Sequence, residues 1–421
     1  MIDYRMLKSK TIIVYGTGER AESAINHLKN NGLIEEVKGF TNSFIEEEDV
    51  LLGKTVYPLQ KVLLLFEDAF FYISPIEPVK SEIIASLTQI GIPIDRIINA
   101  TVRFLSCDEL QKGIIIATSG LVSCCAEPGK NKPFESKWDD FETIEVAIGD
   151  YWENRNKNIE LLKSNEGACG SCTYAKVKPW SKDQQIEIVN IGLYYPCQLS
   201  CCYCNWICNA AHKNSLEKKK RIEKAQNIDV GRVIRYMEEQ KMFSKEGLVS
   251  IASGEFTLAN RRDEVLELIG EHKLAVLTNG IFFNEKIAKM TARNDGSYLN
   301  VSLDAGTKQT YFEVKGLNVF ERVCENLLRY KSFGSNIQLK YIFLESNISE
   351  ENIIGFINIV KRIKPSVVIV SFDYNLGRVD IDERIVLAIS KMIRLLDKLN
   401  IQYSFVDALG KDNIDNIKKY I

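Results

Sequence analysis

The sequence is short of histidine, of long apolar runs and of charge of one sign. Only three histidines occur among 421 residues, and they lie far apart. Mixed His/Cys zinc sites and Ser/His or Cys/His nucleophiles need histidine, so we do not expect them here. The 54 Lys and Arg residues nearly balance 56 Asp and Glu residues, so no net field attracts a polyanion. Nucleic acid is not an expected partner.

No stretch approaches the roughly 20 apolar residues that cross a bilayer, and the first residues lack the features of a signal peptide. We therefore expect a cytoplasmic protein without a membrane partner. The composition, 45% hydrophobic and 26% charged, is that of a globular protein with a full core. Because disulfides seldom persist in a reducing compartment, the 11 cysteines indicate metal or redox chemistry where they cluster.

Short apolar runs alternate with helical patterns in both halves of the chain. In the first half we expect strands at residues 10–15, 37–40, 69–73 and 96–98. In the second half we expect them at residues 186–193, 248–252, 274–278, 298–303, 337–343 and 367–372. This alternation predicts an α/β fold, with a Rossmann-like parallel sheet followed by a partial (β/α)6 barrel whose active site lies at the carboxyl ends of its strands.

This pattern of strands and helices predicts three domains. Residues 1–106 are expected to form the Rossmann-like domain, and residues 185–421 the partial barrel with a C-terminal helix and strand extension. Residues 107–184 are less regular and contain several cysteines, so we interpret them as a connecting segment.

The most informative motif follows the first strand of the second half. Cys197, Cys201 and Cys204 are spaced C-x3-C-x2-C. One loop with this spacing can bind three irons of a [4Fe-4S] cubane and leave the fourth iron without a protein ligand, free to bind a small molecule. A zinc site or a chance group of buried cysteines is the alternative, but the loop lacks the paired C-x2-C units of a zinc ribbon.

This loop, with Tyr203 just before its last cysteine, resembles the radical S-adenosylmethionine (SAM) superfamily. The resemblance implies that the open iron chelates SAM and that its reductive cleavage gives a 5′-deoxyadenosyl radical. It also implies a flavodoxin- or ferredoxin-like electron donor. Three later segments resemble the family's GGEP, TNG and SLDG motifs in the right order, namely Ser253-Gly254-Glu255-Phe256, Thr278-Asn279-Gly280 and Ser302-Leu303-Asp304-Ala305.

By this resemblance, a set of residues would line the SAM cofactor: Tyr203, Gly254, Glu255, Ser302 and Lys315. Lys315 stands where Arg is commoner, which removes bidentate geometry toward the carboxylate. Asp304 would touch substrate or cap the next helix, and the cap is favoured. If the reaction is an epimerisation, a thiol or a phenol must return hydrogen, and the unranked candidates are Cys208, Cys324, Tyr194 and Tyr311.

Cys169 and Cys172 form a second pair upstream of the barrel. They would hold an auxiliary iron–sulfur cluster, with Cys124, Cys125 or Cys208 completing the set, or a structural zinc. A solvent-facing dithiol without metal is equally compatible with the sequence. No cysteine follows Asp373, which excludes the family's cysteine-rich SPASM extension in its usual place.

A glycine-rich turn near the amino terminus points to a phosphate. Gly16 and Gly18 follow a strand and open a helix, so their backbone amides can receive a phosphate group. Phe40-Thr41-Asn42 ends the second strand, where an NAD site would have an acid, so redox-active NAD is disfavoured. The segment resembles the Rossmann-like domains of sugar-modifying proteins. This implies a nucleotide or nucleotide-sugar ligand, and a purely structural domain is the alternative.

Together these features predict a radical SAM enzyme that abstracts hydrogen from a carbohydrate or nucleotide-linked sugar, for epimerisation or dehydration. The sugar rests on the likeness of the amino-terminal domain rather than on site chemistry. An enzyme or maturase acting on a peptide or protein is the second hypothesis. A scaffold or sensor that merely binds a cluster is the third.

Overall fold

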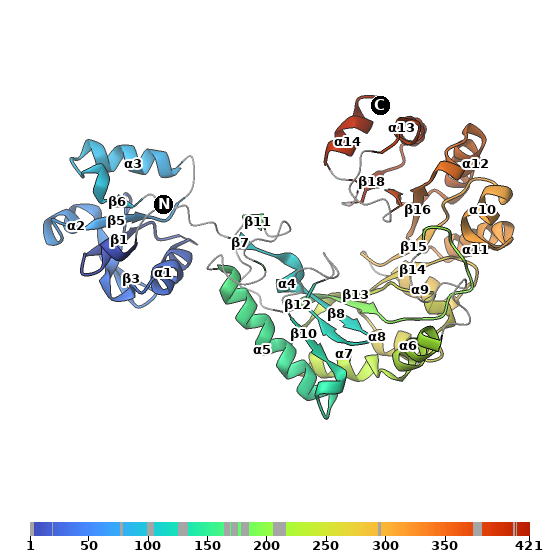
Figure 1. Ribbon diagram of the computed structural model, residues 1–421, viewed down its shortest axis with the longest axis horizontal. Coiled ribbons are helices and arrows are strands. Elements are labelled where there is room, and N and C mark those ends of the chain that lie inside the picture. Colours follow the sequence, from blue (N-terminus) through green and yellow to red (C-terminus); the bar gives the residue numbers. More distant parts are fainter. Residues whose placement is uncertain are drawn as a thin grey trace. The chain divides into compact units, whose positions relative to one another are not determined.

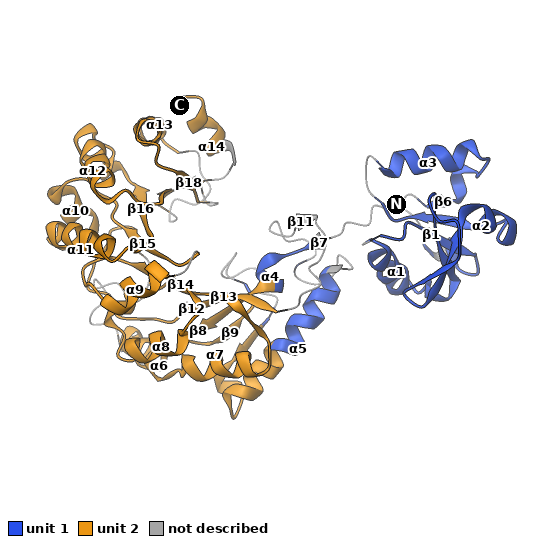
Figure 2. Cartoon of the chain, turned by 180° about the vertical axis from the view of Figure 1, so that it is seen from behind, with its two compact units in different colours: residues 1–111, 124–134, 152–184 blue, residues 112–123, 135–151, 185–421 orange. Residues whose placement is uncertain are grey.

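The computed structural model describes residues 4–18, 20–75, 79–98, 105–124, 134–163, 169, 176–177, 185–204, 216–293, 296–373, 381–406, 409 and 411–421. The chain divides into two compact units (Figure 2). Unit 1 comprises residues 1–111, 124–134 and 152–184, and unit 2 comprises residues 112–123, 135–151 and 185–421. The domain boundaries expected from the sequence remain a prediction.

Unit 1 contains a six-stranded sheet in the order β3-β4-β2-β1-β5-β6. The strands are β1 (Ile12–Tyr15), β2 (Val37–Asn42), β3 (Asp49–Leu51), β4 (Lys54–Pro58), β5 (Phe70–Ile73) and β6 (Ile97–Ile98). Every neighbouring pair is parallel except the β3–β4 hairpin. The four expected strands are confirmed, while β3 and β4 were not anticipated.

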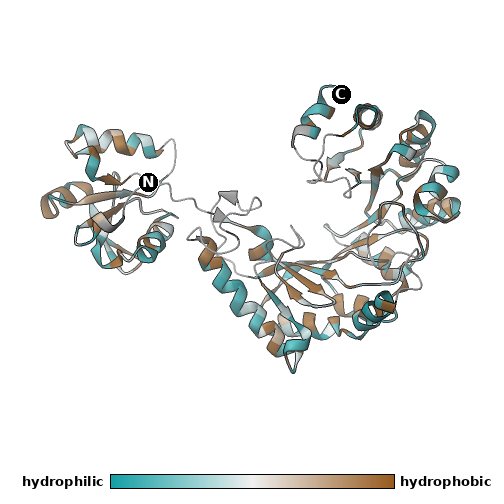
Figure 3. Ribbon diagram, viewed as in Figure 1, coloured by the Kyte–Doolittle hydropathy of each residue, from teal (hydrophilic) through white to brown (hydrophobic). Residues whose placement is uncertain are grey.

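Helices pack on both faces of this sheet, and β1 is therefore buried on both sides. Ile12 and Val14 pack with Leu28 of α1 (Ala21–Asn30), whereas Ile13 packs with Leu87 of α3 (Val79–Gln89). The second helix, α2 (Leu59–Leu65), adds Val62 to the same side as α3. Figure 3 shows the central strands of this sheet as hydrophobic. A strand that packs against apolar layers on both faces has a continuous apolar sequence, which is why the sequence predicts β1.

A smaller apolar cluster completes the description of unit 1. Leu110 of α4 (Asp108–Lys112) packs with Ile159 and Leu162 of α5 (Ile144–Lys163). Arg155 is fully buried, and its Nε donates to the Leu110 carbonyl at 3.1 Å. Two short strands, β7 (Leu105–Ser106) and β11 (Lys176–Val177), pair antiparallel.

Unit 2 is built on a ten-stranded sheet in the order β10-β9-β8-β12-β13-β14-β15-β16-β17-β18. The six expected strands are confirmed as β12 (Ile186–Gly192), β13 (Phe243–Ile251), β14 (Lys273–Thr278), β15 (Tyr298–Ser302), β16 (Ile337–Phe343) and β17 (Val367–Phe372). All six run parallel in chain order. The expected α/β fold with parallel sheets is thus confirmed.

Four further strands extend this sheet at its two ends. The segment expected to be a connection supplies β8 (Gly113–Ala117), β9 (Gly120–Val122) and β10 (Glu135–Lys137). At the other end, β18 (Tyr403–Phe405) pairs parallel with β17. Because β8 pairs parallel with β12, residues before the cysteine loop belong to the same sheet as that loop.

Helices lie between the successive strands and along one face of the sheet (Figure 1). They are α6 (Leu216–Asn227), α7 (Val230–Glu239), α8 (Arg262–Ile269), α9 (Glu285–Arg293), α10 (Lys308–Lys315), α11 (Phe320–Ser332), α12 (Glu350–Ile363), α13 (Glu383–Lys398) and α14 (Lys411–Lys418). Among the described residues, none of the helices has the length and apolar character to span a membrane.

Two glycines allow the loop after β15 to meet α12 directly. A Cβ on Gly306 would collide with the Asn352 carbonyl and the Phe356 amide, and one on Gly355 would collide with the Gly306 carbonyl. The Gly306 amide also donates to the Asn352 side chain at 2.6 Å. This backbone-to-backbone packing holds the carboxyl end of β15 in place.

We expect Gly306→Ala to destabilise unit 2 by about 1–3 kcal/mol, because the added methyl meets backbone that cannot turn aside. Gly149→Ala is the matched control, since Gly149 lies in α5 with open space around its Cβ position. Calorimetry should show a lower Tm for Gly306→Ala and an equal or higher Tm for the control. Equal Tm values for Gly306→Ala and the parent would refute the close packing.

Candidate active site

The cysteine loop follows β12 and is joined to the end of α10 by backbone hydrogen bonds. The Ser200 amide donates to the Lys315 carbonyl and the Cys202 amide to the Val314 carbonyl, each at 3.0 Å. The Cys204 amide donates to the Cys201 carbonyl at 3.0 Å, closing a turn inside the loop. The loop is therefore anchored on both sides of Cys201.

The thiols of the loop differ in exposure. Those of Cys197, Cys201 and Cys204 are half-buried and outside any disulfide, whereas Cys202 is exposed. Burial raises the pKa of the Cys201 thiol, while the nearby Lys315 ammonium lowers it. Three half-buried thiols on one loop, with a cation close by, form a donor set suited to an iron–sulfur cluster.

Glu255 ties the second motif to the third. Its carboxylate is fully buried and accepts from the Thr257 hydroxyl at 2.6 Å, the Thr278 hydroxyl at 2.8 Å and the Asn279 amide at 2.8 Å. Burial raises the pKa of Glu255, and this effect is larger than the lowering caused by these hydrogen-bond donors. Its amide donates to the Pro196 carbonyl of the cysteine loop at 3.1 Å. The carboxylate thus fixes two motif loops beside the cysteines.

Asn279 connects the third motif directly to a cysteine. Its side-chain Nδ2 lies 3.9 Å from the Cys197 Sγ, and its Oδ1 accepts from Gln198 at 3.5 Å. In the sequence, Asn279 belongs to the segment that resembles the family's TNG motif, and that resemblance assigns it no role. The only signal in the sequence is its place one residue after a buried strand, at the edge where the motif loops converge.

Asp304 of the fourth motif forms a hydrogen-bonded network with the side chains of Tyr203 and Lys315. The Tyr203 hydroxyl donates to Asp304 Oδ2 at 2.7 Å and accepts from Lys315 Nζ at 2.7 Å. Lys315 also forms an ion pair with Asp304, and the two side chains are 1% and 0% exposed. Asp304 Oδ1 accepts from the Ile342 amide of β16 at 2.7 Å. Burial raises the pKa of Tyr203 well above its usual value.

The favoured expectation that Asp304 caps the next helix is wrong. Thr307 is the N-cap of α10 and accepts from the Thr310 amide, while both Asp304 carboxylate oxygens face the network. Asp304 also adopts a left-handed φ of 54°, which turns its side chain toward Tyr203 and Lys315. The requirement to neutralise a buried ammonium has outweighed the capping preference.

Several buried polar atoms around these motifs have no hydrogen-bond partner in the part of the chain that the structure describes. They are Gln198 Oε1, Ser253 Oγ and Tyr311 Oη. A polar group bound here would supply the missing partners, so the site fits a cluster and a polar cofactor. Among the described residues, no three His, Cys, Asp or Glu side chains close around a single metal ion. A cubane differs from such a site because each thiolate binds a different iron.

The remaining site candidates lie in different surroundings. Tyr311 is fully buried and packs 5.5 Å from the Phe320 ring, and Ser302 is half-buried at the end of β15. Cys324 lies in α11, where burial raises its pKa to about 11. The Arg221 guanidinium lies 5.7 Å above the Tyr194 ring. Cys208 lies outside the described residues.

The second cysteine pair is described only in part. Cys169 is half-buried and packs with the cluster around Leu110 and Ile159 in unit 1. Cys124 is also half-buried. Cys125 and Cys172 lie outside the described residues, so an auxiliary cluster or zinc remains a prediction.

The amino-terminal turn has one constrained glycine and one open glycine. Gly16 adopts a φ of 120°, and a Cβ there would collide with the Ser74 hydroxyl. A Cβ on Gly18 would meet nothing within 4 Å. At the end of β2, Asn42 Nδ2 donates to the Thr17 hydroxyl at 2.6 Å. The site where an NAD domain would hold an acid thus carries an amide that supports the turn.

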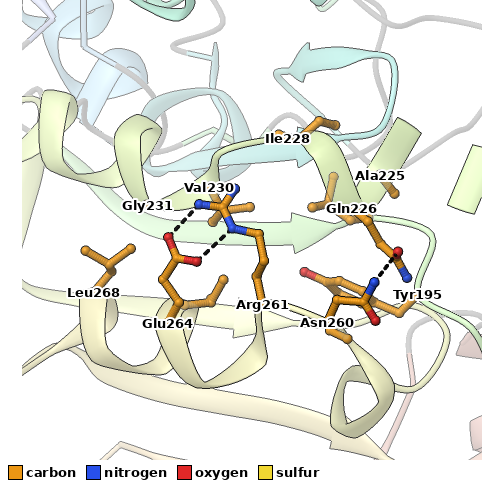
Figure 4. Close-up of a pocket in the computed structure, with 13 residues that line it drawn as sticks. Tyr195, Ala225, Gln226, Ile228, Val230, Gly231, Asn260, Arg261, Glu264 and Leu268 are labelled. Carbon is orange, nitrogen blue, oxygen red and sulfur yellow. Dashed lines mark hydrogen bonds and ion pairs between the residues drawn. The ribbon is translucent and has the colours of Figure 1, made fainter. Parts of the chain in front are cut away.

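A small pocket lies between α6, α7 and α8 (Figure 4). Its wall includes Tyr195, Gly231 and Leu268, and its rim carries the Arg261–Glu264 ion pair. None of the residues expected to bind the cluster or SAM lines it. The pocket is therefore not the candidate active site.

Residues 193–357 match the Radical SAM superfamily, and they contain the four motifs described above. This part of the chain is similar to a radical SAM domain, and the match supports the expectation of an iron–sulfur enzyme that uses SAM. No curated protein matches the chain significantly in sequence. The sugar-related identity of the amino-terminal domain and its Rossmann-like character are not established by the match.

Solved structures show distant likeness. Streptococcus suis SuiB aligns at 14% identity and a TM-score of 0.40, over 63% of this chain and 56% of its own. The anSMEcpe structure with bound AdoMet aligns at 14% identity and a TM-score of 0.39, over 51% and 63%. A radical SAM methyltransferase from Sphaerobacter thermophilus aligns at 13% identity and a TM-score of 0.35, over 52% and 65%. The chain thus spans less than two thirds of each, and likeness this weak decides nothing about substrate.

Glu255→Gln tests whether this carboxylate is a scaffold rather than a cofactor contact. The new amide group would face donors from Thr257 or Asn279, so we expect the metal-free protein to lose about 2 kcal/mol. Thr257→Val, which removes one hydroxyl donor, is the control and should cost about 1 kcal/mol. Calorimetry of the metal-free variants measures both. An unchanged Tm for metal-free Glu255→Gln would contradict the scaffold role.

Proposed function

We propose that this chain is an enzyme that reductively cleaves SAM at a [4Fe-4S] cluster held by Cys197, Cys201 and Cys204. The observation that carries the proposal is the loop of three half-buried thiols, anchored to α10 inside the residues that match the superfamily. When bound, the cluster supplies a low-potential electron and an iron site open to SAM. A flavodoxin- or ferredoxin-like partner is the proposed source of that electron.

The protein's own residues divide into two roles. Gly254 and Ser302 are proposed to line SAM, together with the ring of Tyr203. Glu255 and Lys315 are buried in hydrogen-bond networks, so they act on the site by positioning its loops. Ser253 and Gln198 offer buried oxygens that a polar ligand can satisfy.

The proposed substrate is a carbohydrate or nucleotide-linked sugar, which would undergo epimerisation or dehydration. Side chains alternate along a strand, and on β15 the apolar Leu299 and Val301 are fully buried. Tyr298 and Asn300 therefore share the opposite face, where Asn300 pairs in register with Gln338. The buried Asn300 Oδ1 has no hydrogen-bond partner among the described residues. A hydroxyl-rich ligand on this face would donate to it.

Cys204→Ala is expected to abolish the brown cluster absorbance and the release of 5′-deoxyadenosine and methionine, because two thiolates cannot hold the cubane. The control is Cys202→Ala, which removes the exposed thiol of the same loop. It should keep iron content and cleavage near those of the parent. Anaerobic reconstitution followed by iron analysis and chromatography decides. Full iron content in Cys204→Ala, or its loss in Cys202→Ala, would refute the ligand assignment.

A UDP- or CDP-linked sugar is expected to raise the Tm of the protein, and peptides are not. Gly18→Asp should remove this shift, since a carboxylate at the turn repels the phosphates. Gly18→Ala is the control, because its methyl enters open space and adds no charge. A response to peptides alone would favour the peptide-modifying hypothesis. The sugar proposal fails if no nucleotide-sugar changes the Tm.

A further inference from the structure

Strand β16 carries a lysine on the face of the sheet opposite its helix layer. On this strand Leu339 and Tyr341 are fully buried, and the centres of the Tyr341 ring and the Phe356 ring of α12 lie 4.8 Å apart. Because side chains alternate along a strand, Gln338 and Lys340 lie on the other face, where both are half-buried. The Lys340 side chain therefore points away from α12.

The neighbouring strand β15 places two more polar side chains on this face. Asn300 pairs in register with Gln338, and Ser302 pairs with Lys340. Adjacent strands lie about 4.8 Å apart, so these four residues form one polar patch on the sheet. Within the polar patch, the Asn300 Oδ1 is buried and has no hydrogen-bond partner among the described residues. A ligand that donates a hydrogen bond would satisfy it.

Apolar side chains bound the polar patch on both sides. Leu277 of β14 pairs in register with Asn300, and Ile369 of β17 pairs with Lys340. On this face of the described strands β15, β16 and β17, Lys340 is the one charged side chain. A ligand bound here would therefore meet a single cation, together with amide and hydroxyl groups.

The carboxylate nearest in charge to Lys340 is engaged by other groups. Asp304 Oδ1 accepts from the Ile342 amide, and its Oδ2 accepts from Tyr203 and Lys315. Burial lowers the pKa of Lys340, and the charge of Asp304 raises that pKa by less. An anion bound at the polar patch would offset the effect of burial, because an opposite charge favours the protonated amine.

The polar patch adjoins the proposed SAM site on the side away from the cysteine loop. The four motifs follow β12, β13, β14 and β15, and β16 is the next strand in the sheet. Ser302, at the end of β15, is proposed to line SAM and also belongs to the polar patch. A ligand that contacts Lys340 would therefore lie next to SAM, which is the position a substrate requires.

We propose that the polar patch binds the sugar substrate and that the Lys340 ammonium pairs with an acidic group on the sugar itself, a carboxylate or a phosphate monoester. The inference rests on the proposed function, because it narrows the carbohydrate substrate to acidic sugars. Asn300 and Gln338 bind hydroxyl groups of the same sugar. One ammonium neutralises one anionic group as a point charge, and no bond forms or breaks at Lys340.

Two pairs of compounds that differ only in the acidic group test the proposal. UDP-glucuronate against UDP-glucose tests a carboxylate, and glucose 6-phosphate against glucose tests a phosphate. We expect the reconstituted protein to bind the acidic member of at least one pair about tenfold more tightly, as a hydrogen bond to a charged group contributes. Isothermal titration calorimetry measures the four Kd values, and the ratio within the first pair cancels the contribution of the nucleotide.

Lys340→Met should make the Kd values of the acidic and neutral sugars equal, while the Kd of the neutral sugar stays close to that of the parent. Lys340→Arg keeps the charge and should retain part of the preference. Lys361→Met is the matched control, because Lys361 is an exposed lysine of α12. This control should leave the preference unchanged.

Equal Kd values for acidic and neutral sugars in the unaltered protein would overturn the proposal, and this comparison does not depend on the folding of a variant. The proposal is also wrong if Lys340→Met keeps the preference, or if it weakens the binding of SAM instead of the sugar. If no sugar binds, the sugar substrate of the proposed function fails together with this inference. Release of 5′-deoxyadenosine tests the cleavage of SAM separately.

Discussion

The structure depends on how the cysteine loop is fixed to the end of α10. Two backbone hydrogen bonds join Ser200 and Cys202 to the last residues of that helix. The ion pair between Lys315 and Asp304, completed by Tyr203, lies at the same place. Loops from separate strands meet there because parallel strands bring their carboxyl ends to one edge of the sheet. The rigidity of the proposed cluster site follows from this junction.

Burying an ammonium and a carboxylate is costly unless hydrogen bonds satisfy the remaining donors and acceptors. Asp304 meets this condition, since the Ile342 amide satisfies its other oxygen and Asn347 binds its carbonyl at 2.9 Å. A compact ammonium suits the position, because Lys315 meets a single phenol and a single carboxylate oxygen.

Much of the fold could be predicted from the sequence, because buried parallel strands are continuous apolar runs such as Ile12–Tyr15 and Val367–Phe372. The cysteine spacing likewise indicated the cluster loop, since its ligands are close in sequence. The hairpin strands β3 and β4 escaped prediction because β3 is largely exposed. The role of Asp304 also escaped, because Tyr203 and Ile342 are its partners only after three strands have come together.

The most direct test of the account is whether SAM binds to an iron of the cluster. Electron paramagnetic resonance of the anaerobically reconstituted and reduced protein, recorded with and without SAM, measures this. The account predicts the signal of a [4Fe-4S] centre whose g values change when SAM is added. A signal indifferent to SAM, or zinc in place of iron, would contradict it.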